Sequence, residues 1–306
     1  MHLEQRCVAL QQASARRRGL QCGYDHDMRP LGPTMRRKQL GAELRKLRRD
    51  ADLTMEHAAA VLDCARSRIG HIENGRNSIR KPELQVLLDL YGASDEEHEA
   101  LEELRKEASK RGWWATYRLP SWLQPYVGLE SDAVTLRSFE SELIPGLLQT
   151  EEYSRRLHEV APHVPRPEDI DKHVAARMHR QARLTDDEAP LEFSTIVSEA
   201  AFRRTLADAQ IRPAQLARVV ELAQRPNITV HVLPYAAGLH PSMSGSFTVL
   251  TFDIGVAEPV GYQEYAVGGH VVEDHTAVQW LIELWELLRR QALGADESLR
   301  WLSELL

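Results

Sequence analysis

The sequence predicts an all-α N-terminal domain of five helices, followed by a mixed α+β C-terminal domain. The length of 306 residues makes two domains the natural expectation. Near the N-terminus Leu40, Leu44 and Leu47 recur at helical spacing. Runs rich in β-branched and aromatic residues, which are typical of strands, follow only after residue 190.

The composition changes abruptly near residue 112. The stretch RGWWATYRLPSWLQPYVGLE begins at Arg111 and holds three of the six tryptophans and two prolines. We therefore expect a disordered extension at 1–34, a helical domain at 35–111 and an α+β domain at 112–306.

Cap residues and apolar spacing divide the helical domain into five helices. Thr54 is a residue type that caps helix N-termini, and Ser94 with Glu97 makes a capping box. Gly75 is placed to end a helix in the left-handed conformation. The expected helices span residues 36–51, 55–62, 65–74, 82–91 and 94–111.

The C-terminal part mixes helix and strand signals. Helices are expected at 128–138, in the second half of 143–157, and at 167–184, 198–206 and 213–224, with two more between 275 and 306. Strands are expected at 191–198, 228–234, 245–252 and 258–267. The segment 277–292 is apolar on several faces, so we expect it to be buried, within the monomer or against a second copy.

The net charge of −7 is unevenly distributed along the chain. It amounts to +2 in residues 1–34, +4 in residues 35–92 and −13 in the remainder. A basic N-terminal part on an acidic protein suggests a nucleic-acid contact there. A basic helix that is merely solvated is the alternative.

Several classes of protein are disfavoured by the composition. No apolar run approaches the ~20 residues that a membrane span needs. In residues 1–34 the basic residues Arg16–Arg18 follow the apolar stretch instead of preceding it, and no hydrophobic block is long enough for a secretion signal. The three cysteines include no CxxC pair, so we expect free thiols in a reducing compartment and a cytoplasmic protein. No motif points to a cofactor.

Two further chemistries are disfavoured by the residues themselves. The residues His270, Glu273, Asp274 and His275 lack the spacing of a metal site, so no metal is expected. A self-cleaving repressor would cut at a dipeptide such as Ala237-Gly238 and would need a downstream lysine. The last lysine is Lys172, so we do not expect an enzyme.

The second and third expected helices, joined by a short turn, have the arrangement of a helix-turn-helix. The stretch LTMEHAAAVLDCARSRIGHIENG resembles the DNA-binding domain of the phage-repressor family of the xenobiotic-response-element type. The matching residues are Leu53, Thr54, Glu56, Ala59, Leu62, Ile69, Ile72, Glu73, Asn74 and Gly75.

The resemblance implies roles for several polar residues in and around this stretch. Base edges would be read by Arg66, Ser67 and His71, since arginine can grip guanine O6 and N7 together. The DNA backbone would be held by Thr54, Arg68, Arg76, Asn77 and Arg80. A structural ion pair would join Glu73 to Arg48, and Gly75 would end the reading helix.

Three residues depart from the family pattern. Met55 replaces a glutamine that would contact DNA, and Ala65 replaces the usual Ser or Thr cap at a cost of about 1 kcal/mol. Asp63 replaces the turn glycine, which is tolerable because aspartate enters the left-handed region more readily than most residues.

The C-terminal part resembles a second family, the actinomycete antitoxin-like transcriptional regulators. The resemblance lies in segments such as ELIPGLLQTEEYSRRL, ARMHRQARL and PNITVHVLPYAAGLHPSMSGSFTVLTF. It implies a regulatory domain without catalytic role, with a small protein encoded alongside as candidate partner. Within it Arg177, Arg180 and Arg183 recur at helical spacing and are candidates to bind an acidic ligand; solvent exposure or internal ion pairing is the simpler reading.

Together these patterns predict a sequence-specific transcriptional regulator that binds a double-stranded DNA operator. The DNA-binding module usually reads two half-sites, so a homodimer is expected. The C-terminal domain would provide dimerisation and the sensing of a partner protein or ligand. The alternative is a protein-interaction module with a weakened or vestigial helix-turn-helix.

Overall fold

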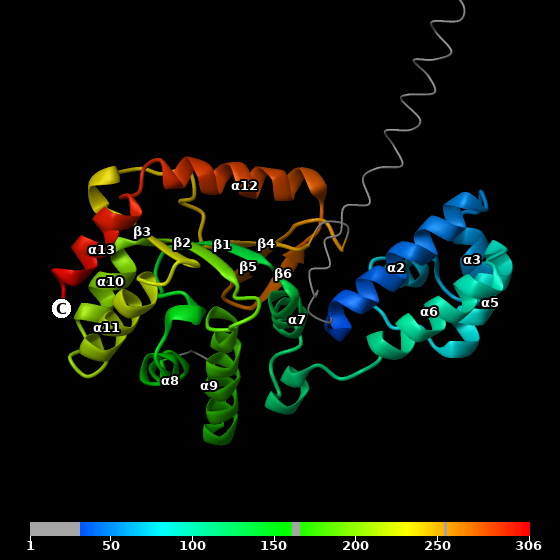
Figure 1. The fold of residues 1–306 in the computed structure, drawn as a ribbon, viewed down its shortest axis with the longest axis horizontal. Helices are drawn as coiled ribbons and strands as arrows, with labels where there is room; N and C mark the ends of the chain where they lie inside the picture. The colour runs from blue at the N-terminus through cyan, green and yellow to red at the C-terminus, as the bar shows by residue number, and fades with distance from the viewer. Residues whose placement is uncertain (1–30, 161–165, 254–255) are drawn as a thin grey trace, which may run out of the picture. The chain divides into compact units, whose positions relative to one another are not determined.

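The computed structural model describes residues 31–160, 166–253 and 256–306 (Figure 1). Cys7, Cys22 and almost all of the extension expected at 1–34 lie outside these residues. Within the described ranges, no helix combines the length and the apolar character needed to cross a membrane.

The N-terminal part consists of five helices, as the sequence predicts. They are α2 (Pro33–Asp50), α3 (Met55–Val61), α4 (Arg66–Glu73), α5 (Lys81–Tyr91) and α6 (Asp95–Ala108). The expected caps are present: Thr54 accepts a hydrogen bond from the backbone N–H of His57 at 3.2 Å, and Ser94 and Glu97 form a capping box. The helices enclose one apolar cluster built on Leu40, Leu44, Ile69, Ile72, Ile79, Leu84, Leu87 and Leu88.

The C-terminal part is built around a six-stranded mixed sheet in the order β3-β2-β1-β4-β5-β6. Its strands are β1 (Thr135–Glu140), β2 (Glu192–Ser198), β3 (Ile228–Leu233), β4 (Phe247–Thr251), β5 (Val260–Tyr265) and β6 (Gly268–Val272). The first three strands run parallel, and β4, β5 and β6 add to them in antiparallel order. The mixed α+β class is therefore confirmed.

Helices cover both faces of this sheet (Figure 1). One face is crossed by α12 (His275–Arg289), which packs on Phe139, Ile196 and Phe247. The larger core lies on the other face, where most of the remaining helices gather. These are α7 (Gln124–Asp132), α8 (Glu151–Glu159), α9 (Pro167–Gln181), α10 (Glu199–Leu206) and α11 (Arg212–Ala223). The last helix is α13 (Ala295–Ser303), and the short 3-10 turns are η1 (Trp113–Tyr117), η2 (Gly146–Leu148), η3 (Ala182–Leu184) and η4 (Tyr235–Ala237).

The prediction of a helix at 128–138 is wrong for the second half of this range. The helix α7 already ends at Asp132, and Ala133 continues in extended conformation into β1. This strand lies between β2 and β4, with Leu136 and Phe139 buried on opposite faces of the sheet. The strand β6 was also not expected from the sequence.

The prediction that the 277–292 segment is buried holds for one side of α12 only. Leu284, Trp285 and Leu288 are buried, and the indole N–H of Trp285 donates to the carbonyl of Ser138 at 3.0 Å. Trp280 and Leu287 on the other side are exposed. The helix is therefore amphipathic, and its sheet-facing side is satisfied within the monomer.

The first turn of α2 packs with the C-terminal part. Met35 is fully buried in the larger core, which also contains Trp114 and Tyr126. The backbone N–H of Gly32 donates to Asp132 Oδ1 at 2.8 Å. Further along the same helix, Leu40 and Leu44 lie in the N-terminal apolar cluster. The helix α2 therefore contributes side chains to both cores. The expected boundaries at 34/35 and 111/112 stay predictions.

Candidate nucleic-acid interface

The helices α3 and α4 meet through a tight turn. Asp63 adopts the left-handed conformation with φ of 47°, as expected of the residue that replaces the turn glycine. The backbone N–H of Cys64 closes the turn by donating to the carbonyl of Ala59 at 2.9 Å. Ala58 and Ala59 are buried, and their small side chains let α3 approach its neighbours closely.

The helix α4 has one apolar side and one polar side. Ile69 and Ile72 are 1% and 3% exposed and lie in the N-terminal core. On the side away from the core Arg66, Ser67 and His71 are exposed to solvent. The helix ends as expected, because Gly75 follows it in the left-handed region with φ of 68°.

The approach of α2 to α4 is close because Gly41 has no side chain. A Cβ atom on Gly41 would lie 2.5 Å from the carbonyl oxygen of Ile72 and 2.6 Å from that of Glu73. Glycine at this position therefore allows α4 to pack directly on the backbone of α2.

A buried ion pair also joins α2 to α4, as expected from the resemblance. The Arg48 guanidinium donates to both carboxylate oxygens of Glu73, through Nε at 2.6 Å and Nη2 at 2.9 Å. Arg48 also donates to the carbonyl of Leu53 at 2.7 Å. The hydrogen bond with Glu73 raises the pKa of Arg48 despite the opposing effect of burial.

The three predicted base-reading residues lie together on the exposed side of α4. Arg66 is its first residue, and its side chain remains 60% exposed. Its Nε pairs with Glu56 of α3 at 2.5 Å, on the surface. Exposed ion pairs contribute little to stability, so this contact can be exchanged for a base edge.

The residues predicted to hold the DNA backbone lie at the start of α3, on α4 and in the loop between α4 and α5. Thr54 caps α3, Asn77 is exposed after α4, and Arg80 is 81% exposed. Arg68 and Arg80 both donate to Glu83 Oε1, at 2.7 and 3.2 Å. Although burial raises the pKa of Glu83, the backbone N–H of Arg80 and the Arg68 guanidinium lower it below its ordinary value.

Arg76 makes a contact that the sequence did not suggest. Its Nη2 donates to Glu273 Oε2 at 2.8 Å, and Lys38 pairs with the other oxygen of the same carboxylate. Burial raises the pKa of Glu273, but the charge of Lys38 and the bonds from Lys38 and Arg76 bring it below the ordinary value. Arg76 must exchange this carboxylate for a phosphate if it holds DNA.

The departures from the family pattern have visible consequences. Ala65 is the N-cap residue of α4 and makes no side-chain hydrogen bond there. Met55 is half-buried and packs against the N-terminal core rather than presenting a polar group. The start of α4 is thus held by the core and the turn, and not by a cap.

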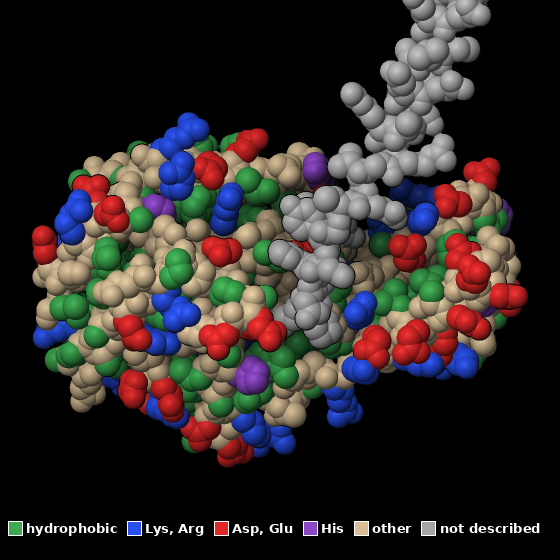
Figure 2. Space-filling view, viewed as in Figure 1, with side chains coloured by type: hydrophobic (Ala, Val, Ile, Leu, Met, Phe, Trp, Pro, Cys, Tyr) green, Lys and Arg blue, Asp and Glu red, His purple; other side chains and the backbone are tan. Residues whose placement is uncertain are grey.

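Acidic side chains gather elsewhere on the N-terminal part. Figure 2 shows them where Figure 1 places α6, whose sequence is DEEHEALEELRKEA. Several are paired within the helix, such as Glu102 with Arg105 at 2.7 Å. This surface repels phosphates, so a DNA contact would use the α4 side of the domain.

Of the three arginines on and after α9, none is simply solvated. Arg180 is paired with Glu130, and Arg183 donates to the carbonyls of Ala133 and Ala189. Arg177 donates to the side-chain oxygen of Gln149. Among the described residues, no group of three or more His, Cys, Asp or Glu side chains is arranged to hold a metal ion.

Comparison with known families identifies both parts of the chain. A family model described as a domain of unknown function (DUF5753) matches residues 123–304, more than half of the chain. A second model, described as a helix-turn-helix domain, matches residues 39–101. Neither the curated proteins nor the solved structures contain a match.

Proposed function

The chain belongs to the DUF5753 family and carries a helix-turn-helix domain ahead of that domain, and from this premise we propose that it is a sequence-specific DNA-binding transcriptional regulator. Its operator is double-stranded DNA, and α4 enters the major groove. Arg66, Ser67 and His71 read base edges, while Thr54, Arg68, Arg76, Asn77 and Arg80 hold the phosphates.

One observation supports this proposal above the others. The helix α4 buries Ile69 and Ile72 while three residues able to hydrogen-bond with bases stand exposed on its other side. The Arg48–Glu73 pair and the close approach at Gly41 fix that side rigidly on α2. A reading helix needs such a rigid support, because base contacts depend on precise placement.

The remaining features of the proposal concern assembly and regulation. We propose a cytoplasmic homodimer, because modules of this kind read two half-sites about one helical turn apart. The C-terminal domain contributes dimerisation and senses a ligand or a partner protein, such as a small protein encoded alongside in an antitoxin-like arrangement. The protein acts by binding and not by catalysis.

Selection from a random pool of duplex DNA tests the proposal. The purified full-length protein is expected to retain a sequence with two related half-sites, about 10–10.5 base pairs apart from centre to centre or a multiple of this. Sequencing of the retained DNA then identifies the operator directly. A retained pool that is as random as the starting pool would contradict the proposal.

A second candidate is a protein-interaction module with a vestigial helix-turn-helix. Its support is that the predicted DNA-contacting arginines already have carboxylate partners. Arg66 pairs with Glu56, Arg68 and Arg80 share Glu83, and Arg76 pairs with Glu273. The selection separates the two candidates, because a vestigial motif enriches no sequence.

A further inference from the structure

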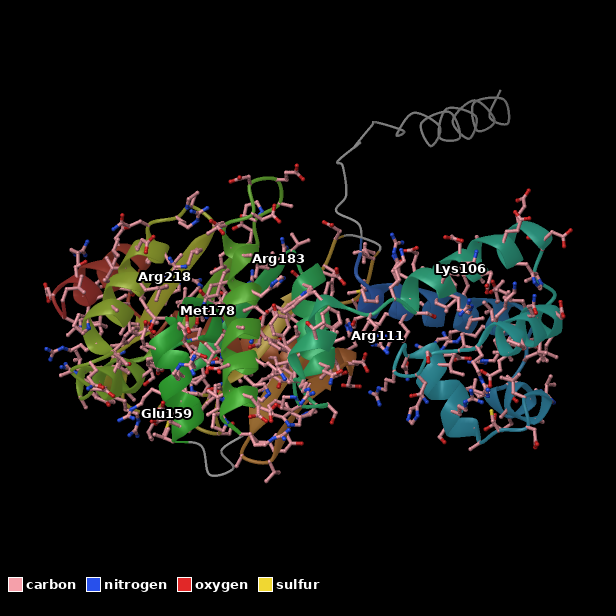
Figure 3. All side chains as sticks on the ribbon, turned by 90° about the horizontal axis from the view of Figure 1, so that it is seen from below. Lys106, Arg111, Glu159, Met178, Arg183 and Arg218 are labelled. Atoms are coloured by element: carbon pink, nitrogen blue, oxygen red, sulfur yellow. The ribbon has the colours of Figure 1, made fainter. Side chains whose placement is uncertain are left out.

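A cavity of about 700 Å³ opens in the C-terminal domain, away from α4. It lies where α7 and α9 pass the ends of β1, β4 and β5, and η2 closes one side. Figure 3 labels Met178 on α9, Arg183 in η3 just after it, and Glu159 at the end of α8, and it shows α8 and α9 side by side. The volume falls in the range of about 300–1,000 Å³ that small-molecule sites occupy.

The walls of this cavity are largely aromatic and aliphatic. The rings of Tyr126 and Tyr262 stack with their centroids 4.2 Å apart, and Trp122 and Phe247 extend the apolar lining. Leu143, which is 42% exposed, lies at the rim. Such a lining favours a ligand with a flat apolar body.

Two guanidinium groups lie side by side at the floor of the cavity. A Cβ atom built on Gly146 would be 3.8 Å from Arg177 Nη1 and 3.7 Å from Arg180 Nη2. Arg180 is fully compensated, because it donates to both oxygens of Glu130 at 2.6 and 2.7 Å. The hydroxyl of Tyr126 donates to the same carboxylate at 2.8 Å.

Arg177 is not compensated in this way. Its hydrogen-bonding side-chain partner among the described residues is the neutral amide of Gln149, and the carboxylates of Glu264, Glu130 and Glu140 act on it through their charges, which raise its pKa. Burial, followed by the charge of Arg180, lowers the pKa of Arg177 to about 10, so it remains a cation at neutral pH. A partly buried cation beside an open cavity attracts an anion.

Other ionisable groups line the cavity beside the two arginines. Burial raises the pKa of Glu140 to about 7, so its carboxyl group keeps a proton for part of the time at neutral pH. Burial lowers the pKa of His158 to about 4, and its buried Nε2 has no hydrogen-bond partner among the described residues. Glu264, the penultimate residue of β5, also lines the cavity; it is exposed and accepts a hydrogen bond from the Tyr262 hydroxyl at 3.4 Å.

We propose that this cavity binds a small organic acid, a molecule with a flat apolar body and one carboxylate or phosphate, with the acid group on Arg177. His158 Nε2 provides a further polar contact for the same ligand. The inference builds on the proposed regulator, in which it supplies the sensed molecule, but the site is defined by its own residues and can be tested without DNA.

Fluorescence titration with 8-anilinonaphthalene-1-sulfonate tests the proposal on the full-length protein. This probe has an aromatic body and one anionic group, and we expect one bound molecule per chain. Arg177→Met should weaken its binding about tenfold or more, because a hydrogen-bonded charge is lost. Binding of the neutral analogue N-phenyl-1-naphthylamine should change less than about threefold, because the apolar walls are intact.

Two further variants keep the outcome unambiguous. Gly146→Ala places a methyl group in ordinary contact with both guanidinium groups, so the fold tolerates it while the space for an acid group shrinks. Gly146→Ala should weaken the binding of the anionic probe, as Arg177→Met does. Arg218→Met on α11 removes a cation of the same domain outside the cavity lining, and it should leave both probes unaffected (Figure 3).

Three results of these titrations would contradict the proposed ligand site. The proposal fails if the wild-type protein does not bind the anionic probe, or if Arg177→Met and Arg218→Met bind it alike. It also fails if Arg177→Met weakens both probes equally, since the site would then be apolar without selectivity for acids. Partial unfolding increases emission of this probe, so it cannot imitate the expected loss.

Discussion

Replacing Glu73 with alanine is expected to lower the free energy of unfolding by about 3–5 kcal/mol. The Arg48 guanidinium would lose both charge-assisted bonds, at 2.6 and 2.9 Å, while it stays buried at 8% exposure. An uncompensated buried charge costs far more than the pair contributes when intact. Urea unfolding followed by circular dichroism measures the change.

The exposed pair between Glu56 and Arg66 provides a control for this prediction. Both side chains are about 60% exposed, so solvent screens their attraction, and Glu56→Ala should change the stability little. A double variant, Arg48→Met with Glu73→Leu, removes both buried charges and should recover much of the loss. Equal losses for Glu73→Ala and Glu56→Ala would show that the buried pair has no special role.

Replacing Arg66 with alanine is expected to reduce the preference for the selected operator over a scrambled duplex by about 1–3 kcal/mol, or roughly 5- to 150-fold. Arg66 begins α4, is 60% exposed and can present two parallel N–H donors to guanine. The loss falls on the operator, because a scrambled duplex offers no guanine at the matching position. Fluorescence anisotropy with both duplexes measures it.

Arg80→Ala is the matched comparison for this prediction. Arg80 lies outside α4, is 81% exposed and is proposed to hold a phosphate. Its loss should weaken operator and scrambled DNA alike, since phosphates carry no sequence information. If Arg66→Ala instead weakens both duplexes by the same factor, Arg66 does not read bases.

Local chemistry made the N-terminal domain predictable from the sequence. Residues near one another in the chain decide where its helices begin and end, as Thr54, Ser94 and Gly75 do here. The inward side of α4 followed from the spacing of Ile69 and Ile72. The Arg48–Glu73 pair came from a family resemblance and not from spacing, because 25 residues separate the partners.

Features that depend on distant segments were missed. The strand β1 has few residues and pairs with β2 and β4, which lie more than 50 residues away, so its local sequence pattern alone predicts the continuation of a helix. The exposure of Trp280 depends on which side of α12 meets the sheet. The contact of Arg76 with Glu273 spans 197 residues and leaves no signal in either local sequence.

The arginines of α9 illustrate the same limit at the candidate ligand site. Their helical spacing predicts that they lie on one side of a helix. It does not decide whether they bind a ligand, pair internally or face solvent. The structure separates Arg180, which Glu130 neutralises, from Arg177, which opens on the cavity without a carboxylate partner among the described residues. That distinction depends on Glu130, 50 residues earlier in the chain.

A salt series with the wild-type protein tests most directly whether α4 and its surroundings bind DNA. If Arg68, Arg76 and Arg80 of both protomers contact phosphates, the logarithm of the affinity for the selected duplex should fall with the logarithm of the salt concentration at a slope of about −5. At each salt concentration the selected duplex should bind at least about 10³-fold more tightly than the scrambled one. An affinity that does not change with salt, and that is the same for both duplexes, would contradict the account.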